Sequence, residues 1–277
     1  AKRMIAGGCL DGVDRVFGLH VWNFMDAGTI GIREGPITAN SDRIYIDITG
    51  AGGHGSMPQG TVDAVLVAAH LVVALHSGVV SRACDPFDAV CLTVGKITGG
   101  RVANAIAGSA RLDGTVRTRT AAVQQMVMEK IQQICAGVAL TFGATIDCEY
   151  RKGYPATVSS RRGALDVQVA AAKIVGEAAV LPPPPTLAGE DRAYYLDGSF
   201  DGAFFFVGSS PVSLRDGQAG VPHHRFDFDV DERCLEVGAS VMVQVCKDVL
   251  GSSMKDDGAA SSTKASPAVV VVEDIAP

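Results

Sequence analysis

The 277-residue chain lacks any concentration of positive charge. Its 24 lysine and arginine residues are outnumbered by 30 aspartate and glutamate residues, which gives a formal net charge of −6. The basic residues are scattered, and the densest group is the pair Arg161 and Arg162. A surface that binds nucleic acid or anionic lipid needs a basic cluster. We therefore expect no nucleic-acid partner and no membrane partner, and we predict a small-molecule ligand instead.

Long apolar runs and paired cysteines are also missing. Charged or glycine-rich segments interrupt every apolar stretch before it reaches membrane-spanning length. The seven cysteines are odd in number and contain no C-x-x-C pair, which favours a reducing compartment, and we expect a cytoplasmic protein. The first residue is Ala1 rather than methionine, so we expect a chain that is processed or lacks its beginning. The absence of a signal peptide therefore says little about targeting.

What is present is a globular composition, with 47% hydrophobic residues. Within residues 36–152, RIYIDIT alternates at period two, and Thr61 to Ser81 and Ala121 to Phe142 have helical patterns. Together with the strand-like runs AVCLTVGKI, ARLDGTVRT and ATIDCEY, this predicts a β-α-β-β-α-β unit with both helices on one sheet face. The sequence thus indicates an α/β protein of two domains. We expect residues 1–35 and 153–250 to form one domain interrupted by the central unit, followed by a disordered tail at 251–277.

The stretch GAGGHGSMP, residues 50–58, lies between a predicted strand and a predicted helix. Its glycines match G-x-G-x-x-G, the pattern of a dinucleotide site, in which the last glycine opens the helix. Here several residues intervene before the helix, and the next predicted strand ends in Lys96 rather than in an acid that would hold a ribose. We therefore interpret the segment as a flexible loop that exposes His54.

The other histidines are open to more than one interpretation. His70 and His76 lie in the predicted helix and are expected to be ordinary helix residues. His20 ends the strand VFGLH, where a packed, hydrogen-bonded histidine is usual. His223 and His224 lie in the loop VPHHRFDFD, where a neutral imidazole could bind metal, but no H-x-x-x-H or H-E-x-x-H spacing supports it. Spacing alone leaves a metal role open.

Two further polar residues have ordinary explanations. Glu190, with Asp191, follows a glycine at a predicted helix start, where carboxylates satisfy free amides. Asn104 lies between two predicted strands, where asparagine is usually a turn residue. No G-x-S-x-G elbow is present, so a serine hydrolase is not indicated.

Taken in order, many segments resemble the metal-dependent aminoacylase and N-acyl amino acid amidohydrolase family, which includes hippurate hydrolase and indole-acetyl-amino acid hydrolases. The resemblance covers residue 1 to about Leu250 and leaves the C-terminal tail outside. The segments that carry it are KRMI, LDGVDRVFGLHVW, GTIGIREGPITANSD, GAGGHGSMP with TVDAV, VSRACDP, TVGKITGG with AN, LDGTVRT, FGATIDCEYRKGYPATV, GEDRAYY, GAFFFVG and HHRFDFD.

The resemblance implies amide hydrolysis of N-acyl amino acids by a catalytic αβ domain that holds two divalent metal ions, zinc or manganese. It also implies a β-α-β-β-α-β satellite domain, through which a homodimer could form. By this resemblance His20 would be a metal ligand, and His223, or alternatively His224, would be another.

Three further roles follow from the same resemblance. His54 would be the satellite-domain histidine that reaches over an active site, often that of a partner subunit, to the scissile carbonyl. Asn104 would help bind the substrate carboxylate, and Glu190 would line the cleft.

One departure from the family pattern concerns the remaining ligands. Relatives carry, upstream of the KRMI-like stretch, a Cys-Gly-His-Asp-Gly-His segment and a Pro-Ala-Glu-Glu segment, and neither occurs here. Amide hydrolysis needs a metal-bound water, a carboxylate that takes its proton, and a polarised carbonyl. We therefore expect this chain to be incomplete as an enzyme. The alternatives are a catalytically inactive fragment, or a dimerisation or binding module built on the satellite domain, including one that senses an amino acid without metal.

Overall fold

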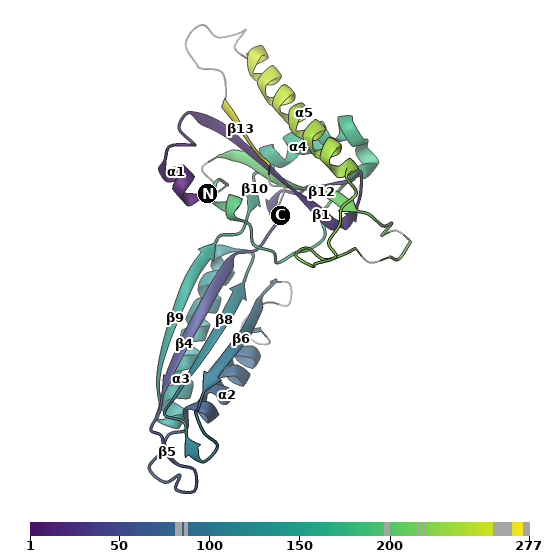
Figure 1. The fold of residues 1–277 in the computed structure, drawn as a ribbon. Coiled ribbons are helices and arrows are strands. Elements are labelled where there is room, and N and C mark those ends of the chain that lie inside the picture. Colours follow the sequence, from purple (N-terminus) through teal and green to yellow (C-terminus); the bar gives the residue numbers. More distant parts are fainter. Residues whose placement is uncertain are drawn as a thin grey trace. The chain divides into compact units, whose positions relative to one another are not determined.

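The computed structural model describes residues 1–80, 85, 88–196, 200–214, 216–218, 220–256 and 268–273, in two compact units (Figure 1). Unit 1 comprises Ala1–Ile37, Thr157–Thr186 and Asp191–Pro277, and unit 2 comprises Thr38–Ala156 and Leu187–Glu190. The main part of unit 2 is therefore inserted between two parts of unit 1. The expected boundaries of the inserted domain were residues 36 and 152.

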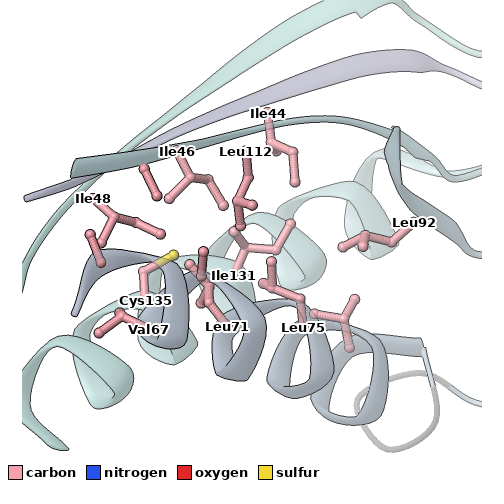
Figure 2. Close-up of a cluster of buried hydrophobic side chains, with 14 of the residues drawn as sticks. Ile44, Ile46, Ile48, Val67, Leu71, Leu75, Leu92, Leu112, Ile131 and Cys135 are labelled. Atoms are coloured by element: carbon pink, nitrogen blue, oxygen red, sulfur yellow. The ribbon is translucent and has the colours of Figure 1, made fainter. Parts of the chain in front are cut away.

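Unit 2 is an antiparallel four-stranded sheet, in the order β6-β8-β4-β9, with two helices on one face. Alternation explains the sheet, because Ile44, Ile46 and Ile48 are buried while the residues between them are not. These isoleucines pack against Leu71 and Ile131 on the two helices (Figure 2). The elements, in the order β-α-β-β-α-β, are β4 (Ser41–Thr49), α2 (Ala64–Leu75), β6 (Cys91–Gly99), β8 (Ser109–Arg117), α3 (Ala121–Phe142) and β9 (Thr145–Tyr154).

Local signals set the helix ends in unit 2. The Asp63 carboxylate accepts hydrogen bonds from the amides of Val65 and Leu66, so α2 begins later than the hydrophobic pattern predicted. A π-helical turn, His76–Val80, continues from its end. Thr120 caps α3, and Gly143, with a left-handed φ of 67°, ends it.

A buried carboxylate ties together the two ends of the inserted segment. Asp42, at the start of β4, accepts hydrogen bonds from Asn40 Nδ2 at 2.5 Å, Gln124 Nε2 at 2.6 Å, the Tyr150 hydroxyl at 2.6 Å and the Gly153 amide at 2.9 Å. All four donors belong to unit 2. A fully satisfied buried carboxylate of this kind fixes the local packing.

Unit 1 is a five-stranded sheet in the order β11-β2-β12-β1-β13. Its central strands, β1 (Val13–Asp26) and β12 (Asp201–Ser210), are parallel, and β12 is buried along nearly its whole length. Such burial is typical of a strand covered on both faces. The shorter strands are β2 (Ile30–Gly31), β11 (Val180–Leu181) and β13 (Ala268–Glu273).

Helices α4 (Arg161–Val175) and α5 (Arg233–Asp256) pack against one face of this sheet. Helix α4 begins at Arg161 because the Ser160 hydroxyl accepts a hydrogen bond from the Gly163 amide, and it ends before Gly176. The short elements of unit 1 are α1 (Lys2–Ala6), the pair β3 (Gly35–Pro36) and β10 (Val158–Ser159), and the 3-10 turns Glu177–Ala179 and Asp191–Tyr194. Asp191 therefore begins a single 3-10 turn.

The C-terminal segment differs from the disordered tail that its composition predicts. Helix α5 continues to Asp256, and Ala268–Glu273 pairs in parallel with β1. Residues 257–267 and 274–277 lie outside the described residues. Across the described parts of the chain, no helix is long and apolar enough to cross a membrane.

Candidate active-site residues

Two histidines from distant parts of the sequence meet in unit 1. His20 lies in β1, and His223 lies in the loop between β12 and α5. Their ring centroids are 5.6 Å apart, with the ring planes at 73°. The carbonyl oxygen of Val21 lies 2.6 Å from His20 Nδ1 and 3.1 Å from His223 Nε2.

The shared carbonyl determines which nitrogens of these rings can bind a cation. A carbonyl oxygen only accepts hydrogen bonds, so His20 Nδ1 and His223 Nε2 must both be donors. In the neutral rings, His20 Nε2 and His223 Nδ1 then carry the free lone pairs. A metal-binding histidine commonly donates its other ring N–H to a backbone carbonyl in this way.

An aromatic cluster surrounds His223. Its ring stacks on Trp22 with centroids 4.6 Å apart, and Trp22 stacks in turn on Phe206 at 4.4 Å. Burial lowers the pKa of the His223 imidazole below its ordinary value; the His20 and His224 rings act in the same direction, and the bond to Val21 acts against it. His223 is therefore held in its neutral form, which is the form that binds metal.

The structure separates the two adjacent histidines that the sequence left as alternatives. His223 faces His20, whereas His224 is exposed and has a left-handed φ of 65°. Geometry thus brings His20 together with His223, not with His224.

The fit to a metal site is partial. Zinc and manganese sites usually hold at least three protein ligands. Within the described parts of the chain, no group of three or more histidine, cysteine, aspartate or glutamate side chains could hold a metal ion. The imidazole pair therefore provides two nitrogen lone pairs and no complete site.

Unit 2 brings His54 and Asn104 together. His54 lies in β5 (Gly53–His54), which pairs with β7 (Ala105–Ile106), and the Gly55 amide donates a hydrogen bond of 2.8 Å to the Asn104 carbonyl. His54 and Asn104 are both exposed at this strand pair. His54 pairs with Ala105, so Asn104, the residue before β7, lies next to the end of β5.

The glycines of this segment are explained by close backbone approach. A Cβ at Gly50 would lie 2.2 Å from the Val62 carbonyl oxygen, and one at Gly55 would lie 3.0 Å from the Asn104 carbonyl oxygen. The segment leads into β5, and α2 begins only at Ala64. The first amides of α2 are bonded within the chain, because Ala64 donates to the Ala107 carbonyl and Val65 and Leu66 donate to the Asp63 carboxylate, whereas a dinucleotide site leaves such amides to the phosphates.

Glu190 is half-buried at the end of the short segment Leu187–Glu190, which belongs to unit 2. The neighbouring Ala188 carbonyl accepts a hydrogen bond of 2.9 Å from the Ala39 amide, which anchors the segment.

Sequence reasoning missed three features of these sites: the Val21 carbonyl, the stacking of Trp22, and the contact of 2.8 Å between the Ser56 hydroxyl oxygen and His54 Nδ1. Strand alternation could have found Trp22, because residues 20 and 22 of one strand lie on the same face. The other two depend on side-chain rotamers and loop geometry that no short pattern encodes.

Comparisons with known proteins agree on one family. The family sequence model described as peptidase family M20/M25/M40 matches residues 1–248 of the chain. The chain is 32% identical over 253 residues to an N-acetyl-L-cysteine deacetylase of Bacillus subtilis (strain 168), covering 91% of this chain and 58% of that protein. It is 36% identical over 163 residues to an N-acyl-L-amino acid amidohydrolase of Geobacillus stearothermophilus, covering 59% of this chain and 44% of that protein.

A solved structure supports the same relationship. A protein of methicillin-resistant Staphylococcus aureus, assigned as an aminohydrolase, matches with a TM-score of 0.80 and 30% identity, over 89% of this chain and 62% of that one. The chain spans about 60% of the length of the first curated relatives it matches.

Proposed function

Because the chain belongs to the peptidase family M20/M25/M40, we propose that it works in a metal-dependent hydrolase that cleaves the amide bond of N-acyl amino acids. The observation that carries the proposal is the convergence of His20 and His223 in unit 1, with one free nitrogen lone pair on each ring. The named activities of the relatives on N-acetyl-L-cysteine and N-acyl-L-amino acids support the substrate class.

In this proposal, His20 Nε2 and His223 Nδ1 each hold a divalent ion, zinc or manganese, in a site for two ions. Such an ion, when bound, activates a water and polarises the amide carbonyl. The Val21 carbonyl orients both rings, and stacking on Trp22 keeps water away from one side of His223. Within the described residues, no third histidine, cysteine, aspartate or glutamate side chain joins this pair to complete a metal-binding group.

Unit 2 supplies the substrate-facing groups in the same proposal. His54 donates a hydrogen bond to the scissile carbonyl, and the side-chain amide of Asn104 binds the substrate carboxylate. Their exposed position at the β5–β7 strand pair leaves both accessible to a ligand. Glu190 lines the cleft.

We further propose a homodimer through α2, in a cytoplasmic protein. Leu66 and Val73, one heptad apart on this helix, are 49% and 67% exposed. Apolar side chains that share a helix face and remain in water are typical of an interface.

The test is a hydrolysis assay with N-acetyl amino acids on the natural polypeptide that carries this sequence. Activity should require zinc or manganese, should vanish with a chelator, and should fall at least about a hundredfold in His20→Ala and His223→Ala, as loss of a metal-site group does. His224→Ala is the matched control, because this side chain faces solvent. Full activity in His223→Ala would contradict the proposal.

A second candidate is a non-catalytic binding module built on unit 2. It is favoured by the lack of a third metal ligand in the described part of the chain. This candidate predicts a stable dimer that hydrolyses no N-acyl amino acid with any divalent metal, even in the natural polypeptide.

A further inference from the structure

The turn that follows β5 contains a contact that the proposed function does not use. His54 Nδ1 lies 3.2 Å from the backbone nitrogen of Ser56, which donates to it, and 2.8 Å from the Ser56 hydroxyl oxygen. The turn that makes this possible is closed by the Met57 amide, which donates a hydrogen bond of 2.9 Å to the His54 carbonyl. The imidazole is therefore held by the backbone that immediately follows it.

These two contacts restrict the tautomer of the His54 ring to different extents. A hydroxyl can donate or accept, so the contact with Ser56 Oγ alone fits either tautomer of the ring. A backbone N–H can only donate, so it requires Nδ1 to carry a lone pair rather than a proton. Because the Ser56 amide donates to Nδ1, the Ser56 hydroxyl must also donate to Nδ1 rather than accept a hydrogen bond from it.

From this geometry we propose that Ser56 is a positioning residue, which holds neutral His54 in the tautomer with its proton on Nε2. In a neutral imidazole, one nitrogen donates and the other accepts, and the partner of one nitrogen selects the state of the other. Nε2 of His54, whose side chain is exposed, is then an N–H donor.

The consequence bears on the reaction and rests on the proposed function. A fixed N–H donor suits an oxygen that gains negative charge as an amide carbonyl is attacked, because it needs no reorientation at that moment. A ring with its proton on Nδ1 would instead present a lone pair to that oxygen, which would repel it. Ser56 would thus set whether His54 helps or opposes the developing charge.

The backbone around the His54 turn supports this role. The amide of Gly55, between His54 and Ser56, donates a hydrogen bond of 2.8 Å to the Asn104 carbonyl, so the residue that follows His54 is tied to the turn before β7. Thr61 closes the far side of the loop through a hydrogen bond of 2.6 Å from its hydroxyl to the Pro58 carbonyl. The ring and its partner therefore lie on one constrained turn.

The test is the tautomeric state of His54 in the full 277-residue chain, read by ¹⁵N NMR of the imidazole nitrogens at a pH where the rings are neutral. His54→Ala assigns the resonances, and exposed His76 on the π-helical turn gives the reference for an unconstrained ring. We expect His54 Nδ1 to resonate as an acceptor nitrogen and Nε2 as a protonated one, more completely than in His76.

Variants separate the side chain from the backbone. Ser56→Ala keeps the backbone N–H and removes the hydroxyl, and should move the tautomer ratio toward that of His76 by roughly two- to fivefold, the value of one modest hydrogen bond. Ser56→Thr keeps the hydroxyl and should restore the wild-type ratio. Thr61→Val removes a loop hydrogen bond that does not touch His54, and should leave the ratio unchanged.

Each opposite result overturns the proposal. A His54 ratio equal to that of His76, or a protonated Nδ1, shows that the turn does not select the tautomer. An unchanged ratio in Ser56→Ala removes the role of the side chain. Because the measurement needs no turnover, it stays separate from the hydrolase proposal, which fails instead if the natural polypeptide shows no metal-dependent hydrolysis.

Discussion

The ring of His20 lies 5.6 Å from the ring of His223, and the single carbonyl of Val21 accepts a hydrogen bond from both. One backbone atom therefore fixes two tautomers at once. As a result, the lone pair of each ring lies on the nitrogen that does not contact Val21, and that nitrogen can bind a cation.

Divalent metal should be detectable through Trp22, the single tryptophan of the chain, because its ring stacks on His223. Titration of the metal-free chain with Zn²⁺ should change the Trp22 fluorescence. His223→Ala should weaken the apparent affinity about tenfold or more, which corresponds to about 1.4 kcal/mol.

His224→Ala provides the control for this titration, since the side chain is exposed. It should leave the Zn²⁺ response of Trp22 unchanged. Equal losses in the two variants would show that the loop as a whole, rather than His223, governs the response.

Removal of the buried Asp42 carboxylate should destabilise unit 2. Asp42→Ala leaves four donors without their acceptor, and we expect the free energy of unfolding to fall by about 3–5 kcal/mol, as for other broken buried polar networks. Chemical denaturation followed by circular dichroism measures this loss. Asp147→Ala, at an exposed position of β9, should change it by less than about 0.5 kcal/mol, and a similar loss in both variants would contradict the role of Asp42.

Alkaline pH should destabilise the fold through Tyr150. Burial, and then the hydrogen bond to the Asp42 carboxylate, raises the pKa of the Tyr150 hydroxyl above its ordinary value. The unfolded chain loses this proton near pH 10, whereas the folded chain keeps it, so the stabilisation is fully present below about pH 10 and is lost as the pH rises further.

Denaturation midpoints across this range measure the effect. Tyr150→Phe should be less stable at neutral pH, because it lacks the bond to Asp42, but its stability should fall less steeply above pH 10. Parallel curves for the two proteins would show that Tyr150 does not contribute to the alkaline loss.

A charge on the exposed face of α2 should prevent the proposed dimer. Val73 is 67% exposed, so Val73→Glu should not harm the core of unit 2 but would place a carboxylate in the interface. Sedimentation should change from dimer to monomer, while Thr115→Glu, at an exposed position of β8, should leave the dimer intact. A dimer that persists in Val73→Glu would place the interface elsewhere.

Periodicity in the sequence predicted the elements of unit 2 because its sheet has one buried face. The alternation of Ile44, Ile46 and Ile48 with polar residues and Tyr45 can be seen directly in the sequence. The strands of unit 1 were harder to predict from the sequence, because β1 and β12 are buried on both faces and their sequences do not alternate between apolar and polar residues. The strand β13 was missed, since its flanking residues are small and polar and composition alone favoured disorder.

The candidate site was predictable only through family resemblance. Spacing did not connect His20 with His223, because their neighbourhood is created by the parallel pairing of β1 with β12. The sequence alone also did not show whether His223 or His224 lies beside His20, because this depends on the left-handed backbone at His224. The contact between Ser56 and His54 likewise depends on the conformation of a turn, which amino-acid composition does not predict.

The pairing of Pro36 with Val158 across β3 and β10, and of Ser41 with Tyr154 across β4 and β9, has a consequence for how such a gene can change. The main part of unit 2 leaves unit 1 and returns to it through these neighbouring strands, and Leu187–Glu190 joins it from later in the chain. A segment of different length or sequence could be exchanged between those two points while the β3–β10 pair keeps its hydrogen bonds.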